Sequence, residues 1–109
     1  MIRTACLAAV LTAVSTVASA QDTGRGQKVF LEQKCSICHS VAGVGNKKGP
    51  LDSVGAKLTA MEIRQWIVNA PEMAAKVKAE RKPAMKAFTA LASGDVDALV
   101  TFLQTLNKK

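Results

Sequence analysis

The chain's only histidine stands in a five-residue motif with two of its three cysteines, because residues 35–39 read CSICH. Cys35, Cys38 and His39 have the spacing i, i+3 and i+4, and residues at this spacing share one face of a helical turn. Both sulfurs and the imidazole are therefore expected to point to the same side of the backbone. The fold has to leave that side open to whatever the three groups bind.

Zinc binding, dithiol redox chemistry and a structural disulfide are alternative interpretations of the two cysteines. A structural zinc site needs four ligands, and beyond residue 20 the chain offers only Cys35, Cys38 and His39 as Cys or His ligands. A thioredoxin-like dithiol belongs to a βαβ setting, and no strand-like alternation surrounds the motif. A tight disulfide in an exported protein remains the simplest alternative.

The same spacing, Cys-x-x-Cys-His, is the attachment signal for a c-type haem. In this interpretation Cys35 and Cys38 form thioethers with the vinyl-derived carbons of the porphyrin, and His39 reaches the iron as an axial ligand. Because such a haem is attached on the exported side of a membrane, the interpretation requires an export signal. We expect one covalently bound haem c.

The first twenty residues have the pattern of a secretory signal peptide. Arg3 is the only charge before Asp22, and residues 5–18 consist mainly of Ala, Val, Leu, Thr and Ser. Ala18 and Ala20 then supply the small residues that a signal peptidase requires. We expect residues 1–20 to be cleaved and residues 21–109 to form one domain in the bacterial periplasm.

A retained membrane anchor is the alternative interpretation of this segment. Its uncharged run, residues 4–21, is near the lower length limit for a membrane span, and its Thr and Ser content makes it weakly apolar. We therefore expect no stable membrane insertion after cleavage. Cys6 precedes the apolar stretch, unlike a lipoprotein cysteine, and should leave with the peptide.

Apolar periodicity and helix-capping patterns predict an all-α domain of four to five short helices. Residues 40–58 hold four glycines and a proline and are expected to form a loop. Ile63, Trp66, Ile67 and Ala70 form one apolar face of a helix. The expected helices run from Asp22 or Thr23 to about Lys34, from a capping box at Thr59–Glu62 to Pro71, from there to about Arg81, and from Ser93 or Asp95 toward the C-terminus.

Large side chains are scarce in this small domain. The only aromatic residues are Phe30, Trp66, Phe88 and Phe102, and tyrosine is absent. A domain of this size with so few large side chains has difficulty in filling a core by itself. We therefore expect the haem to occupy the centre of the core, and we expect the chain without haem not to fold stably.

From about Thr23 to Leu106 the chain resembles the small mono-haem class I cytochromes c. The resemblance implies the cytochrome c fold, helices wrapped around one covalently bound haem, and one-electron transfer. The segments that carry it are 26–30 (GQKVF), 35–39 (CSICH), 49–51 (GPL), 66–67 (WI), 82–88 (KPAMKAF) and 99–103 (LVTFL).

The second axial ligand has to come from methionine, lysine or the chain's own amine, because histidine is exhausted. Among the methionines, Met61 and Met73 are more simply explained as packing residues in helices. Met85 differs because Pro83 excludes regular helix around it, and it lies 46 residues after His39, enough chain to reach the opposite haem face. We expect Met85 to be the ligand.

The resemblance adds roles for residues around the two ligands. It places the ligand methionine in a proline-containing loop before an aromatic residue, here Phe88, and commonly has a proline where this chain has Lys86. That departure is expected to loosen the loop. The resemblance also implies that the second ring nitrogen of His39 donates a hydrogen bond to the backbone carbonyl of Pro50.

Four further residues have structural interpretations. By resemblance, the Trp66 indole lies near a haem propionate, although a core position explains it equally well. Gly26, Phe30 and Phe102 resemble the crossing of the first and last helices, where the glycine permits close approach.

Two axial ligands from the chain leave the iron no open position, which favours an electron carrier over an enzyme. Removing residues 1–20 leaves 14 Lys and Arg against 8 Asp and Glu, a net charge of +6. A basic rim would favour redox partners with acidic docking surfaces, and no motif indicates nucleic acid binding. A permanent electron-accepting subunit of a periplasmic dehydrogenase and a haem-based sensor or gas-binding protein stay open. The rim residues are Lys34, Lys47, Lys48, Arg81, Lys82 and Lys86.

Overall fold

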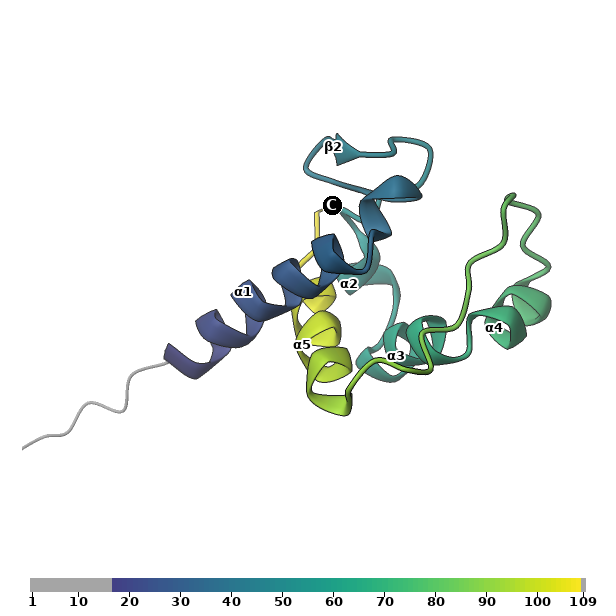
Figure 1. The fold of residues 1–109 in the computed structure, drawn as a ribbon. Coiled ribbons are helices and arrows are strands. Elements are labelled where there is room, and N and C mark those ends of the chain that lie inside the picture. Colours follow the sequence, from purple (N-terminus) through teal and green to yellow (C-terminus); the bar gives the residue numbers. More distant parts are fainter. Residues whose placement is uncertain (1–16, 109) are drawn as a thin grey trace, which may run out of the picture.

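The fold is almost entirely helical, as predicted (Figure 1). The computed structural model describes residues 17–108, so most of the expected signal peptide, Cys6 included, lies outside the described residues. Among the described residues, no helix combines the length and the apolar character needed to cross a membrane. The elements are α1 (Val17–Glu32), a 3₁₀ turn η1 (Cys35–Ile37), β1 (Ser40–Val41), β2 (Val44–Gly45), α2 (Val54–Lys57), α3 (Ala60–Val68), α4 (Ala70–Val77) and α5 (Ser93–Gln104).

The ends of the first helix differ from the prediction. The described part of α1 starts at Val17, so the helix already includes Asp22 and Thr23, which were expected to cap it; residues 17–21 contain no glycine or proline that would interrupt a helix. It ends at Glu32, and Lys34 adopts a left-handed backbone conformation with φ of 59°. This left-handed residue separates α1 from the cysteine-containing turn η1.

Among the described residues, α1 and α5 make the most extensive contact between two elements where they cross (Figure 1). A Cβ at Gly26 would overlap with the carbonyl oxygen of Ala98 and with the Phe102 side chain, so only glycine permits this approach. Phe30 and Phe102 meet edge to face, with ring centroids 5.9 Å apart. The predicted close crossing at Gly26, Phe30 and Phe102 is therefore confirmed.

The helix α3 has the predicted capping box. The Thr59 hydroxyl accepts from the Glu62 amide at 3.1 Å, and the Glu62 carboxylate accepts from the Thr59 amide at 3.0 Å. On the apolar face Ile63 and Ile67 are buried, whereas Trp66 is only half-buried. This face packs against α5. The buried core consists of Val29, Phe30, Ile63, Ile67, Val96, Leu99, Val100, Phe102 and Leu103.

The segment 40–58 is more regular than the expected loop. β1 and β2 pair antiparallel, with Ser40 opposite Gly45 and Val41 opposite Val44. Strands of two residues and a four-residue helix, α2, are too short to produce a readable hydrophobic period. The loop prediction missed them for that reason.

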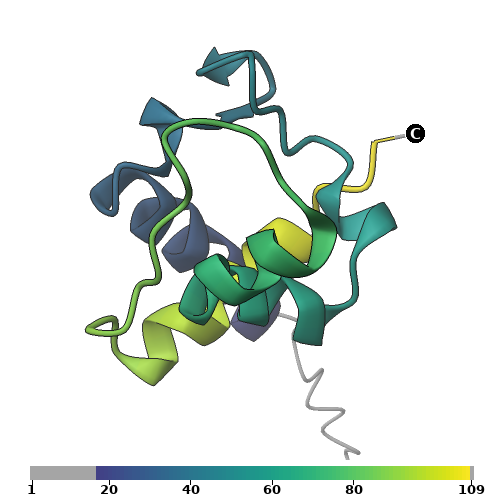
Figure 2. The ribbon, with the colours of Figure 1, turned by 90° about the vertical axis from the view of Figure 1, so that its right-hand side faces the viewer.

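The next helix, α4, is shorter than predicted, and a long irregular segment follows it. Pro71 lies in the first turn of α4, where a missing amide hydrogen costs nothing. The helix ends at Val77, before the expected end near Arg81, because Lys78 takes a left-handed conformation with φ of 52°. Residues 79–92 then form an arch that leaves α4, passes the cysteine-containing turn and returns to α5 (Figure 2).

Candidate functional site

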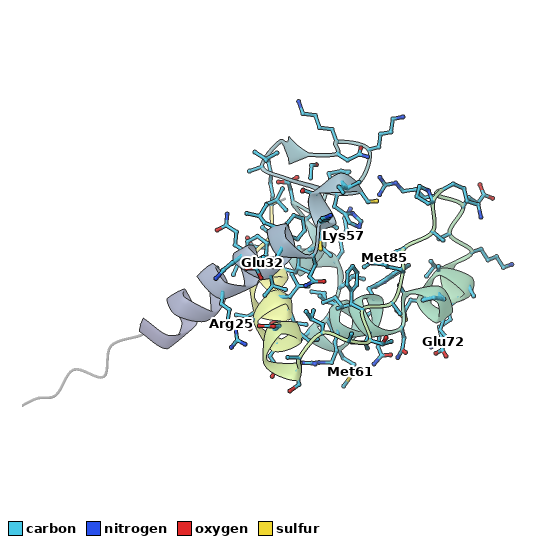
Figure 3. All side chains as sticks on the ribbon, in the orientation of Figure 1. Arg25, Glu32, Lys57, Met61, Glu72 and Met85 are labelled. Atoms are coloured by element: carbon cyan, nitrogen blue, oxygen red, sulfur yellow. The ribbon has the colours of Figure 1, made fainter. Side chains whose placement is uncertain are left out.

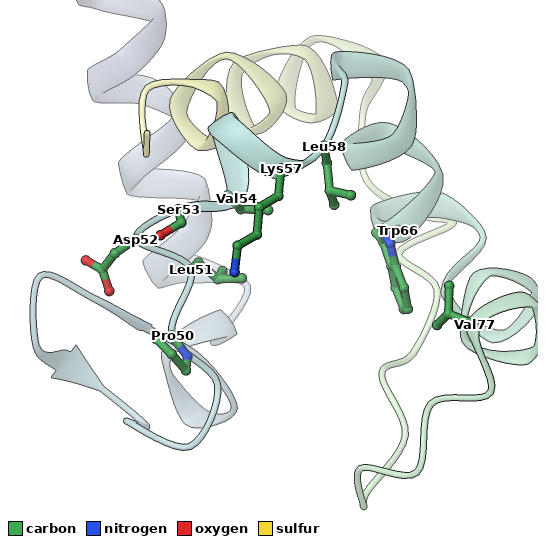
Figure 4. A pocket seen from close by; sticks show the side chains of 9 residues that line it. All are labelled: Pro50, Leu51, Asp52, Ser53, Val54, Lys57, Leu58, Trp66 and Val77. Atoms are coloured by element: carbon green, nitrogen blue, oxygen red, sulfur yellow. The ribbon is translucent and has the colours of Figure 1, made fainter. Parts of the chain in front are cut away.

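Two adjoining hollows lie beside the helical core, and the arch contributes to the inner one through Met85. The inner one has a volume of about 110 Å³ and is lined by Cys35, His39, Met85 and apolar side chains. The outer one has a volume of about 400 Å³ and lies between Pro50 and Leu51 on one wall and Trp66 and Val77 on the other (Figure 4). The two hollows share Leu51, Val54, Leu58 and Trp66, so they form one continuous site.

The cysteine motif is folded as one tight turn. The Cys35 carbonyl accepts from the amide of Cys38 at 3.1 Å and from that of His39 at 2.8 Å. The second bond is the i to i+4 bond of a helical turn, and it brings Cys35 and His39 to the same hollow, as predicted. Cys38 is half-buried and lines neither hollow, so the prediction that both sulfurs share the side of the imidazole holds only for Cys35.

His39 is oriented by a backbone carbonyl, but that carbonyl belongs to Gly49. The distance from His39 Nδ1 to the Gly49 oxygen is 3.1 Å, so the assignment to Pro50 was wrong by one residue. Ser40 donates its amide to the same oxygen at 3.0 Å, and a bridge between Ser40 and Pro50 holds the two segments in register. This pairing directs the Gly49 carbonyl toward the motif, whereas the Pro50 side chain lines the outer hollow.

Burial dominates the electrostatics of the motif. It lowers the pKa of His39 from its usual value, against the opposing effect of the Gly49 carbonyl and with a smaller contribution from the Arg81 charge. Burial also raises the pKa of Cys35 to about 11, so the thiol is protonated at neutral pH. The dithiol alternative, which needs a ready thiolate, gains no support.

The disulfide and zinc alternatives also gain no support. Cys35 and Cys38 are both free thiols. Within residues 17–108, no group of three or more His, Cys, Asp or Glu side chains is placed to hold a metal ion. The donors that do meet in the hollow are a thiol sulfur, an imidazole and a thioether, from Cys35, His39 and Met85.

The three methionines beyond residue 20 have different surroundings. Met85 is half-buried in the wall of the inner hollow. Met61 is 67% exposed at the start of α3 and points away from the site, so its expected packing role was wrong (Figure 3). Met73 is half-buried outside both hollows, and its expected core neighbour Val77 is 59% exposed in the outer hollow.

Three contacts hold the arch that carries Met85. The Phe88 amide donates to the Ile67 carbonyl at 2.9 Å, which fixes the end of the arch to α3. The Lys86 ammonium lies 5.1 Å from the centre of the Phe88 ring, a cation–π contact made by the residue that replaces the family's proline. On the other side, the Arg81 guanidinium donates to the Cys38 carbonyl at 2.5 Å.

The site roles of Lys57 and Gly49 were missed at the level of sequence, and Arg81 was placed only in the basic rim. Lys57 lines the outer hollow from α2, where its side chain runs along the wall toward Leu51 (Figure 4). Gly49 and Arg81 meet at the motif, because a Cβ at residue 49 would overlap with the guanidinium. Gly49 was named only within the GPL segment of the resemblance, Arg81 only among the six rim residues, and nothing local distinguished Lys57 from the other basic residues. The six predicted rim residues are all exposed.

The donor set and the walls fit a haem. Inside, apolar walls surround imidazole, thiol and thioether groups that suit iron and thioether attachment. Outside, the hollow contains polar groups, including the Lys57 ammonium, that suit the acidic edge of a porphyrin. Leu51, Val54, Leu58 and Trp66 are apolar and only half-buried, as expected of side chains that a cofactor covers.

Comparison with known families agrees with this site. The model of the Cytochrome c family matches residues 24–107. Comparisons with curated proteins and with solved structures give no match. The matched region contains the attachment motif, the helical crossing and the arch with Met85. With a helical fold around a site of this chemistry and a match over most of its length, the chain belongs to the cytochrome c family, whose members carry a covalently bound haem c and serve in electron transfer.

Proposed function

We propose that this protein is an exported one-electron carrier in which Cys35 and Cys38 hold the haem and His39 and Met85 bind its iron. The observation that carries the proposal is a single hollow into which Cys35, His39 and Met85 all project. The imidazole comes from the cysteine-containing turn and the thioether from the arch, so the two ligands reach the hollow from separate segments of the chain.

Each proposed ligand has a distinct role. The Gly49 carbonyl holds Nδ1 of His39, which leaves Nε2 as the nitrogen available for iron. A thioether ligand such as Met85 favours the ferrous form and raises the reduction potential. The haem supplies reversible one-electron chemistry, and the protein sets its potential and access. With His39 and Met85 both bound to the iron, the protein would offer no open iron site to a substrate.

A matched pair of methionine variants tests the ligation. Met85→Ala should abolish the ferric sulfur-to-iron charge-transfer band and lower the reduction potential. Met61→Ala removes an exposed methionine and should leave both unchanged. Loss of the band in Met61→Ala or Met73→Ala, or its survival in Met85→Ala, would contradict the assignment. Ready binding of carbon monoxide by the native ferrous protein would favour the gas-binding alternative instead.

Export and partner choice form the second part of the proposal. The sequence signals cleavage after Ala20, which lies inside α1, so the mature chain would begin at Gln21 within that helix. Mass spectrometry of the periplasmic protein tests this directly. A mature mass that includes residues 1–20 would contradict cleavage, and stable co-purification with a dehydrogenase would favour the subunit alternative.

The six exposed basic residues of the rim support an acidic partner surface. Opposite charges accelerate encounter, and salt screens this effect. Stopped-flow reduction of an anionic oxidant should therefore slow as ionic strength rises, whereas the reaction with a cationic oxidant of similar potential should accelerate. Equal salt dependence for the two reagents would exclude a basic docking rim.

A further inference from the structure

Arg81 joins the arch to the segment that orients His39. Its Nη2 atom donates to the Cys38 carbonyl at 2.5 Å, although the two residues are 43 positions apart. Its Nη1 atom fills the place that a side chain on residue 49 would take. The guanidinium therefore contacts both the residue before His39 and the residue whose carbonyl binds the His39 ring.

Little else holds the middle of the arch. The backbone is tied at Ala79, which donates to the Ala74 carbonyl at 2.9 Å, and again at Phe88, which donates to Ile67 at 2.9 Å. For residues 80–87 of the described chain, the Arg81 bond is the only hydrogen bond. Met85 lies in this stretch, four residues after Arg81.

The Arg81 charge has no competing partner in the described part of the chain. The three ion pairs there join Arg25 to Asp95, Lys28 to Glu32 and Arg64 to Asp97. A charged donor on a neutral carbonyl forms a stronger hydrogen bond than a neutral donor does. The planar guanidinium also presents several nitrogens in a fixed fork, which lets it contact Cys38 and Gly49 at once, whereas a lysine offers one nitrogen.

We propose that Arg81 is a positioning residue, a clasp that fastens the Met85 segment to the His39 segment and so keeps the thioether in the hollow. The proposal rests on the ligation by Met85 proposed above. In this chain the proline that commonly follows the ligand methionine is replaced by Lys86. The clasp restrains the arch on the N-terminal side of Met85 instead. Opening of the arch would require the guanidinium to leave Cys38.

Competition with imidazole for the ferric iron measures how firmly Met85 is held. In the haem-bound full protein, Arg81→Gln should raise the apparent imidazole affinity about tenfold, the factor expected for loss of one hydrogen bond from a charged donor. Arg81→Lys retains the charge without the fork and should give an intermediate affinity. Lys82→Gln is the matched control, because it removes the same charge from the next residue and Lys82 makes no hydrogen bond or ion pair.

A double-mutant cycle separates the clasp from other effects of the charge. When Met85→Ala is already present there is no thioether to hold, so adding Arg81→Gln should leave imidazole affinity unchanged. An equal rise in both backgrounds would overturn the clasp, and so would an Arg81→Gln protein that behaves like Lys82→Gln. If the wild-type spectrum shows the sulfur–iron band and either of these results is obtained, the clasp is overturned but the ligation of the iron by Met85 stands. Absence of the band in the wild type would overturn both proposals.

Discussion

The two sides of α5 are built differently. Toward α1, the helix is covered by Val29, Phe30 and the backbone at Gly26, and both of these apolar side chains are buried. Toward the arch, its Leu99 and Leu103 face a hollow in which Leu51, Val54, Leu58, Trp66 and Met85 remain only half-buried. One side is a core that the polypeptide completes by itself, and the other is a core that needs a cofactor.

The α1–α5 crossing and the side of α5 that faces the hollow therefore have different structural roles. The crossing fixes the backbone frame, because edge-to-face aromatics and a glycine contact tolerate little change in volume. The site side tolerates more change in the protein but depends on the haem for most of its packing. Substitutions on the two sides should therefore alter different measurable properties.

The largest expected effect comes from removing the haem attachment. The double variant Cys35→Ala, Cys38→Ala should retain no haem through denaturing electrophoresis and should lose cooperative thermal unfolding, because the hollow would stay unfilled. Haem staining and circular dichroism check these outcomes. A cooperative transition near that of the wild type would show that the chain completes its core without haem.

The next effect tests the crossing alone. Gly26→Ala should lower the free energy of unfolding by about 2–3 kcal/mol, because the new methyl group meets backbone that cannot move away. Gly24→Ala is the matched control in the same helix, since nothing lies within 4 Å of its Cβ position. It should be neutral or stabilise the protein by up to about 1 kcal/mol. Urea denaturation followed at 222 nm measures both, and similar values for the two variants would refute the tight crossing.

A smaller effect is expected at the outer hollow. Lys57→Gln removes a positive charge beside the proposed acidic edge of the haem and should lower the reduction potential by up to about 40 mV, the equivalent of roughly 1 kcal/mol for a partly exposed charge pair. Lys28→Gln removes an exposed charge from α1 and serves as the control. Redox titration measures the reduction potential of both variants. Equal changes in potential would show that Lys57 lies no closer to the haem edge than Lys28 does.

The smallest effect concerns the capping box of α3, the helix between the two regions. Hydrogen bonds from Thr59 lower the pKa of Glu62 below its usual value. Its carboxylate therefore contributes stability above the unfolded-state pKa, and this contribution disappears as the pH falls through the lowered folded-state pKa. Glu62→Gln should be slightly less stable than the wild type at pH 7 and equally stable at about pH 2. A stability difference that persists in acid would assign the effect to something other than the charge.

Much of the helical frame was predictable because its signals are local. The capping box of α3 and the start of α5, expected at Ser93 or Asp95 and observed at Ser93, follow from residues within one helical turn. The glycine at the crossing came instead from the resemblance to the family, because its contacts at Ala98 and Phe102 are distant in sequence. The shorter elements β1, β2 and α2 were missed because their length is below any hydrophobic period. The predicted end of α4 was wrong because the left-handed residue that ends the helix is Lys78, whereas the usual sequence signal for such an end is a glycine.

The sequence by itself determined the chemistry of this protein: a haem attachment motif, one histidine, and three methionines beyond residue 20 as candidates for the second ligand. Such features are readable because they depend on spacing along the chain. Only the tertiary structure decided which carbonyl orients His39, that Met85 lines the same hollow as Cys35, and that Arg81 spans 43 residues to reach Cys38. These depend on contacts between distant segments, which are set by how the helices pack and not by neighbours in sequence.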